Sequence, residues 1–118
     1  MATSQNTQVV SVIAGETSVI YTFVSLQSDG KYDISAQGER PAGIAAEDGV
    51  ADGDALAMVI PNGAIAKVKA GDATTIGAAV GSDATGRAID HVSAAGDFRA
   101  GIFLDAAGAA NEIVRIQF

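Results

Sequence analysis

The stretch SAQGERPAGIAAEDGVADGDALAMVI, residues 35–60, recurs later in the chain as SAAGDFRAGIFLDAAGAANEIVRIQF, residues 93–118. Residue 35 falls on residue 93 and residue 60 on residue 118, and the alignment needs no gap. The Ala-Gly-Ile at residues 42–44 then matches the Ala-Gly-Ile at residues 100–102. An offset close to half of the 118-residue chain is typical of an internal duplication, so the sequence predicts two similar units.

Turn signals separate short runs of alternating or β-branched residues along most of the chain. Clear examples are Ser28-Asp29-Gly30 and Pro61-Asn62-Gly63. Such signals recur about every 8–12 residues, which is typical of an all-β sandwich or barrel. The Ala-rich pieces are too short or too interrupted by glycine to predict helices. Strands are predicted at residues 9–14, 19–26, 31–35, 55–60, 64–70, 76–80 and 113–118, with a further short strand at the corner of residues 42–44.

We therefore expect an all-β fold, a small β-barrel or sandwich built from two similar β-units in a pseudo-twofold relation. Residues 1–8 are polar and without period, and predict a flexible, extended N-terminal arm. Residues 9–118 then form a single all-β domain that contains the repeat of residues 35–60 and 93–118. The strand at residues 19–26 is apolar on both faces, which suits a strand covered on both sides.

The composition limits the classes of function. Fourteen acidic and seven basic residues give a net charge of −7, which argues against binding a nucleic-acid backbone. No apolar run reaches the roughly 18 residues that a membrane span needs. The N-terminal sequence lacks the features of a secretory signal, so we expect synthesis and assembly in a cytosol. The apolar residues are mostly small, with 5% aromatics and no Trp. A core built from them is thin, which favours further burial against partners.

An acidic loop is the first candidate for chemistry. Four carboxylates within eight residues could supply the oxygen ligands that calcium prefers. Their spacing does not match a calcium-binding loop, and the second repeat has Ala106 and Ala110 in place of two of them. A solvated turn explains the loop more simply, with a calcium site as the alternative. The four residues are Glu47, Asp48, Asp52 and Asp54.

No pattern of residues predicts catalysis. His91 is the sole histidine, and in a strand its neighbour Asp90 would point to the opposite face. A catalytic base needs a nucleophile or an orienting carboxylate around it, so His91 is interpreted as an ordinary strand or surface residue. A zinc site lacks ligands, since the chain has no Cys and no second His. We therefore expect no enzyme activity, no metal and no cofactor.

Glycines and small apolar residues between residues 40 and 118 carry a family resemblance. They include the segments 62–64, 70–72, 83–87, 100–102 and 112–116. This pattern resembles that of the small head decoration, or cement, proteins of tailed bacteriophages. The resemblance implies a structural virion protein on the outer surface of the capsid, which assembles as a dimer or trimer and bridges neighbouring major capsid proteins. A carbohydrate- or receptor-binding module of a phage fibre is the alternative.

Two surfaces are predicted to serve this function. The arm and the start of the following strand are expected to lie along the capsid and add a strand to an exposed sheet edge. The apolar strand at residues 19–26 is expected to form the seam of a homo-oligomer. The predicted capsid contacts are Ala2, Thr3, Ser4, Gln5, Asn6, Thr7, Val9 and Val10. The predicted oligomer contacts are Val19, Tyr21 and Phe23.

Overall fold

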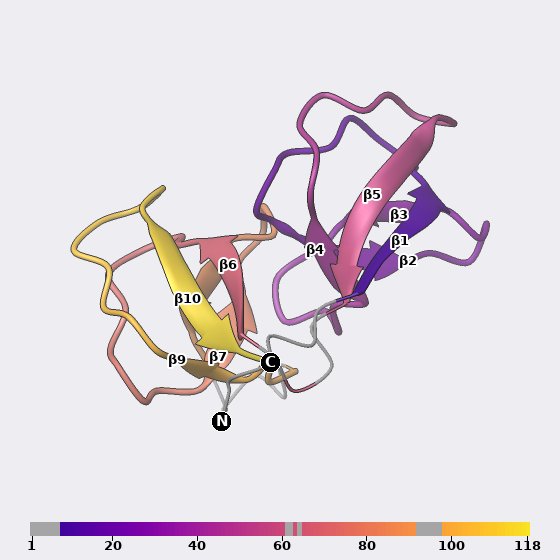
Figure 1. The fold of residues 1–118 in the computed structure, drawn as a ribbon. Coiled ribbons are helices and arrows are strands. Elements are labelled where there is room, and N and C mark those ends of the chain that lie inside the picture. Colours follow the sequence, from indigo (N-terminus) through magenta and orange to yellow (C-terminus); the bar gives the residue numbers. More distant parts are fainter. Residues whose placement is uncertain (1–7, 61–62, 64, 92–97) are drawn as a thin grey trace.

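The computed structural model describes residues 8–60, 63, 65–91 and 98–118, which form strands and the turns between them (Figure 1). The all-β prediction is confirmed. No helix in this described part of the chain has the length and apolarity needed to cross a membrane. The strands are β1 (Gln8–Ile13), β2 (Phe23–Leu26), β3 (Tyr32–Ile34), β4 (Gly43–Ala45), β5 (Ala55–Ile60), β6 (Ile65–Lys69), β7 (Val80–Ser82), β8 (Ala88–Asp90), β9 (Ile102–Phe103) and β10 (Ile113–Gln117).

The described strands fall into two units, which Figure 1 shows as two lobes. In the first unit one antiparallel sheet has the order β1-β5-β4-β2-β3. In the second unit β6-β10-β9 and β7-β8 are joined by an antiparallel bridge between Ala79 and Ile102, which gives the equivalent order. The two edges of the first sheet meet only at a parallel bridge between Ala14 and Tyr32, and the second unit repeats this arrangement. Each unit is therefore a small, curled, sandwich-like sheet and not a closed barrel.

The strand register shows that the duplication covers both units in full. The β4–β5 pair Ile44–Val59 recurs as the β9–β10 pair Ile102–Gln117, at the same offset as the aligned sequence stretches. The β2–β3 pair Val24–Ile34 recurs as the β7–β8 pair Val80–Asp90, at an offset that is shorter by two. The repeat thus extends upstream of residues 35–60. The offset rises from 56 to 58 after β8, so the second unit has two extra residues between its β7–β8 pair and its β9–β10 pair.

The predicted strand at residues 19–26 is only partly correct, because β2 begins at Phe23. Tyr21 turns the chain with a φ of 63°, a left-handed conformation that is unusual for a bulky residue. The equivalent residue of the second unit is Gly77, with a φ of 83°. This second turn likewise keeps residues 76–79 out of the strand predicted at residues 76–80. A β-branched and aromatic run therefore predicted a strand where the fold places a turn.

Candidate assembly surfaces

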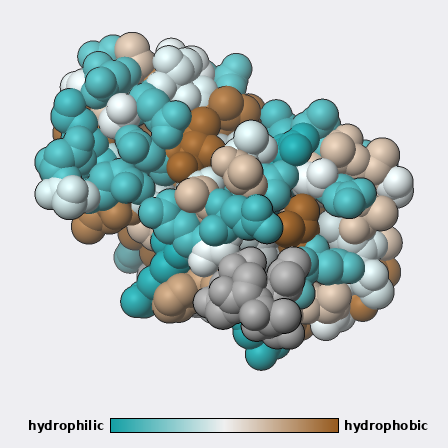
Figure 2. All heavy atoms as spheres, turned by 180° about the vertical axis from the view of Figure 1, so that it is seen from behind, coloured by the Kyte–Doolittle hydropathy of each residue, from teal (hydrophilic) through white to brown (hydrophobic). Residues whose placement is uncertain are grey.

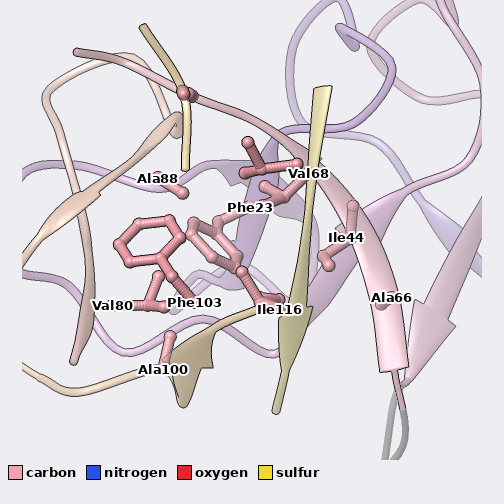
Figure 3. Close-up of a cluster of buried hydrophobic side chains, with 12 residues drawn as sticks. Phe23, Ile44, Ala66, Val68, Val80, Ala88, Ala100, Phe103 and Ile116 are labelled. Atoms are coloured by element: carbon pink, nitrogen blue, oxygen red, sulfur yellow. The ribbon is translucent and has the colours of Figure 1, made fainter. Parts of the chain in front are cut away.

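Two clusters of buried apolar side chains hold the units together. One lies within the first unit and consists of Ala14, Val24, Ala45, Leu56 and Met58. The other is larger and is formed mostly by the second unit, with two residues contributed by the first unit, Phe23 and Ile44. Figure 3 shows Phe23 from β2 among the second unit's side chains, beside Phe103. The two units therefore share a core across their junction.

Phe23 is the anchor of this junction. Its side chain is 0% exposed within a single chain, and its ring lies 6.3 Å from that of Phe118, centroid to centroid. The prediction that Phe23 contacts another copy of the chain is therefore wrong, because the second unit already covers it. Val19 and Tyr21 are half-buried and line hollows at the same junction. Contact of these two residues with another copy stays a prediction.

Backbone hydrogen bonds also join the two units at the junction. The Lys69 N–H donates to the Tyr21 carbonyl at 2.7 Å, and the Phe23 N–H donates to the Gly86 carbonyl at 2.7 Å. Gly86 has a φ of 75°, and a methyl group added there would lie 2.8 Å from the Phe23 carbonyl oxygen. The first unit thus uses its β2 side, and the second unit uses the edge of β6 and the turn before β8. These faces are not equivalent, so the predicted pseudo-twofold relation is wrong.

A groove of about 730 Å³ lies on one side of the junction. Leu26 and Phe98 are exposed on it, and the Arg40 guanidinium lies over the Phe98 ring, 5.3 Å from its centroid. Such cation–π contacts at exposed sites are worth about 0.5–1 kcal/mol. Arg99 adds a second cation to the groove of this acidic protein. Figure 2 shows hydrophobic residues at the surface between the two lobes.

The edge strand β1 carries the described part of the predicted capsid contact. It pairs with β5 alone, and among the described strands no other pairs with its free edge. Val9 is exposed, whereas Val10 packs on the first unit's own core. Gln8 lies opposite Ile60, which lines the groove at the junction. The other predicted contacts, Ala2, Thr3, Ser4, Gln5, Asn6 and Thr7, lie outside the described residues.

Three of the four carboxylates of the acidic loop have separate partners. Glu47 Oε1 accepts the Ala57 N–H at 2.8 Å, Asp48 Oδ1 accepts the Ile20 N–H at 3.2 Å, and Asp52 pairs with Lys31 at 3.0 Å. Within the described residues, no group of three or more His, Cys, Asp or Glu side chains could hold a metal ion. The loop is therefore explained by the contacts that fasten it to the sheet.

Asp105 shows what the equivalent carboxylate does in the second unit. It accepts the Arg115 backbone N–H at 2.9 Å and binds the Arg115 guanidinium through both oxygens. These hydrogen bonds lower the pKa of Asp105 to about 2, the side-chain bonds contributing most and the backbone bond next. In both units, then, the carboxylate ties its loop to the last strand of the unit. Lys31 gains a raised pKa from its hydrogen bond to Asp52.

His91 follows β8 and is half-buried. Its backbone N–H donates to the Ala79 carbonyl at 2.8 Å. Glu47, Asp48 and Asp52 thus make side-chain contacts within the fold, and His91 makes a backbone hydrogen bond. The groove residues Leu26, Arg40 and Phe98 were missed, because nothing in their sequence neighbourhoods indicates that two units bring them together.

Comparison with known proteins gives one family. The model of this family, described as phage cement protein, matches residues 4–118 of the chain. Among curated proteins, no sequence matches the chain. The structure is similar to the crystal structure of the N base of the head fiber protein gp8.5 of bacteriophage phi29, with a TM-score of 0.74. That similarity covers 93% of this chain and 92% of the other at 18% identity, a level that shows a common fold alone.

Proposed function

The chain belongs to the phage cement protein family and is a structural protein of the virion, and we propose that it binds the outer surface of the phage head. There it stabilises the shell by bridging neighbouring major capsid proteins, after assembly in the host cytoplasm. The match of the family over nearly the whole chain is the observation that carries this proposal. No catalytic step and no cofactor is part of it.

The arm and the start of β1 are the proposed capsid contact. Because β1 is an edge strand and Val9 is exposed on it, the Gln8 end of the strand offers both backbone groups and an apolar side chain to a partner. Residues Ala2–Thr7 continue from that end, and we propose that they add a strand to an exposed sheet edge of the capsid. Fixing any segment in one conformation costs conformational entropy, so we expect one arm alone to bind weakly.

Repetition supplies the strength that one arm lacks. A decoration protein binds at many symmetric sites of one shell, and copies linked to one another bind it with far higher avidity than single copies. A homo-oligomer, dimer or trimer, is therefore part of the proposal. The groove with Arg40 and Arg99 is a second surface that suits an acidic or apolar segment of the capsid protein.

Binding to expanded, empty heads tests the arm. A variant lacking residues 2–7 should be lost from the heads after sedimentation, whereas the full chain should remain bound. A matched control replaces residues 2–7 by a Gly-Ser segment of equal length, which keeps the spacing and removes the side chains. Unchanged occupancy of both variants would exclude the arm, and failure of the full chain to bind any head would overturn the proposed function itself.

One observation favours a second candidate function. The structural similarity to the N base of a head fiber protein suits a protein that attaches a fibre or receptor-binding module to the head. A carbohydrate-binding version of this idea needs exposed aromatic side chains, and Phe98 is the exposed Phe of the described residues. A glycan array with the purified chain separates the alternatives, because a cement protein should bind capsids and no glycan.

A further inference from the structure

The junction between the units joins two different faces of one repeated fold. The first unit contributes its β2 side, which we call the donor face and define by Ile20, Phe23 and Ile44. The second unit contributes the face around Lys69 and Gly86, which we call the acceptor face. The contact is heterologous, since the hydrogen bonds that join these faces have no reversed counterparts among the described residues.

Each unit nevertheless carries both faces, because the fold is duplicated. The equivalences set by the strand register place the second unit's donor face at Ile76, Ala79 and Ile102. They place the first unit's acceptor face at Ile13 and Gly30. The described contacts between the units involve neither of these faces, so one donor face and one acceptor face remain free.

Exposure at equivalent positions measures how open the free faces are. Ile44 is 1% exposed at the junction, whereas its equivalent Ile102 is 39% exposed. A methyl group on Gly86 would clash with the first unit, whereas one on Gly30 would meet no atom within 4 Å. Ile76 is 65% exposed on the free donor face.

The free acceptor face is also apolar. Ile13 is 43% exposed and stands where the second unit has Lys69. The exposed large apolar residues of the described chain thus gather on the two free faces and in the groove, apart from Val9 and Ile113. On the donor faces, Ile20 and Ile44 of the first unit lie at the junction, whereas their equivalents Ile76 and Ile102 of the second unit are exposed. Such surfaces are typical of an interaction site.

We propose that copies of this chain associate head to tail, the free donor face of one copy packing on the free acceptor face of the next. Each contact between chains then repeats the geometry of the contact within the chain. The Ile13 end of β1 lies at this interface, which leaves its Gln8 end and the arm for the shell. The inference concerns only contacts between copies and does not depend on capsid binding.

A contact in the groove indicates that the copies associated head to tail close into a ring. Arg40 and Phe98 are equivalent residues of consecutive units, and they are in contact. Equivalent residues can meet only where they lie close to the rotation axis and where the shift along that axis is small. A rotation with a small shift favours a closed ring over an open filament. The groove would line the middle of that ring.

Two variants test the proposal without any capsid. Ile102→Asp blocks the free donor face, and Ile13→Asp blocks the free acceptor face. Each variant alone should be monomeric, with at least about tenfold weaker self-association than the wild type in sedimentation velocity. A one-to-one mixture of the two variants should form a dimer and no larger assembly, because each variant retains the face that the other lacks. Ile113→Asp, exposed outside both free faces and outside the groove, should assemble as the wild type does.

Each other outcome overturns the proposal. Circular dichroism and a melting curve first establish that both variants are folded; Ile102→Ser and Ile13→Ser replace any that is not. A wild-type chain that stays monomeric up to millimolar concentration contradicts self-association. Single variants that still assemble, or a mixture that gives only monomers, contradict the head-to-tail arrangement even if the chain forms an oligomer. Whether the arm variants are retained on capsids neither supports nor contradicts this proposal.

Discussion

Alanine at Gly86 and at Gly30 should have unequal effects on stability, although the two glycines occupy the same turn of the duplicated unit. Both have a positive φ, 75° and 83°. An L-residue in this conformation costs about 1–2 kcal/mol, and alanine recovers about 0.4–1 kcal/mol by restricting the unfolded chain. Gly30→Ala should therefore lower the free energy of unfolding by only about 1 kcal/mol.

Gly86→Ala adds a clash at the junction to the same backbone cost. The new methyl group would lie 2.7 Å from Ile34 Cγ2 and 2.8 Å from the Phe23 carbonyl oxygen. Overpacking of this kind costs about 1–3 kcal/mol. A shift that relieves it also strains the hydrogen bond from the Phe23 N–H to the Gly86 carbonyl, worth about 1 kcal/mol. The total loss should be about 2–5 kcal/mol.

Urea unfolding followed by circular dichroism measures both variants. The protein concentration is kept low enough that the chain is monomeric, since the face around Gly30 is a proposed contact between copies. With a slope of about 1–3 kcal/mol per molar urea, Gly86→Ala should have a midpoint lower by roughly 0.3–4 M than that of Gly30→Ala. Equal midpoints for the two variants would refute the reasoning, because the junction would then be too loose to register a methyl group.

Two further substitutions test the junction and the loops. Phe23→Ala should lower the free energy of unfolding by about 3–5 kcal/mol, because the ring is fully buried between the units. The control Leu26→Ala, at an exposed residue, should lower it by less than about 1 kcal/mol in the same urea titration. Equal losses for the two variants would count against a shared core. Asp105→Asn should melt at a lower temperature than the wild type at pH 7, where the carboxylate is charged. The folded-state pKa of Asp105, about 2, lies below the unfolded value of 3.8, so its stabilisation is present above about pH 4 and is lost as the pH falls through 2. The two melting temperatures should therefore approach each other as the pH falls from about 4 through 2, and a gap at pH 2 as large as that at pH 7 would contradict this assignment.

The fold class and the duplication could be predicted because both depend on patterns within short stretches of the sequence. Turn residues and alternating apolar residues predict short strands wherever they occur, and the ungapped match of residues 35–60 and 93–118 indicates the repeat. The same alignment places Glu47 on Asp105, an acidic residue in both repeats. The alignment does not indicate their role, because each carboxylate accepts a backbone N–H from the last strand of its unit, a contact that only the fold brings about.

The junction could not be predicted from the ungapped alignment. Extended upstream, that alignment places Phe23 on Gly81, whereas the strand register of the first half of each unit places Phe23 on Ala79. The same register matches Ile34 with Asp90 and Ile13 with Lys69. The two units thus differ in sequence at equivalent faces, of which one is covered at the junction and the other is exposed. Two residues inserted between β8 and β9 hide this divergence from an ungapped alignment.

The two proposals, if both hold, explain why a weakly binding arm suffices. Gln8 lies opposite Ile60, and Ile60 lines the groove in which the equivalent residues Arg40 and Phe98 meet. A ring closed around that groove gathers the starting points of all its arms near one axis. Arms anchored together in this way bind a symmetric shell at a high effective concentration, so the affinity of the ring exceeds that of any single arm. Ile102→Asp should then weaken capsid retention although the arm is unchanged. The variant is expected to be monomeric, so each arm would bind the shell without the avidity of the ring.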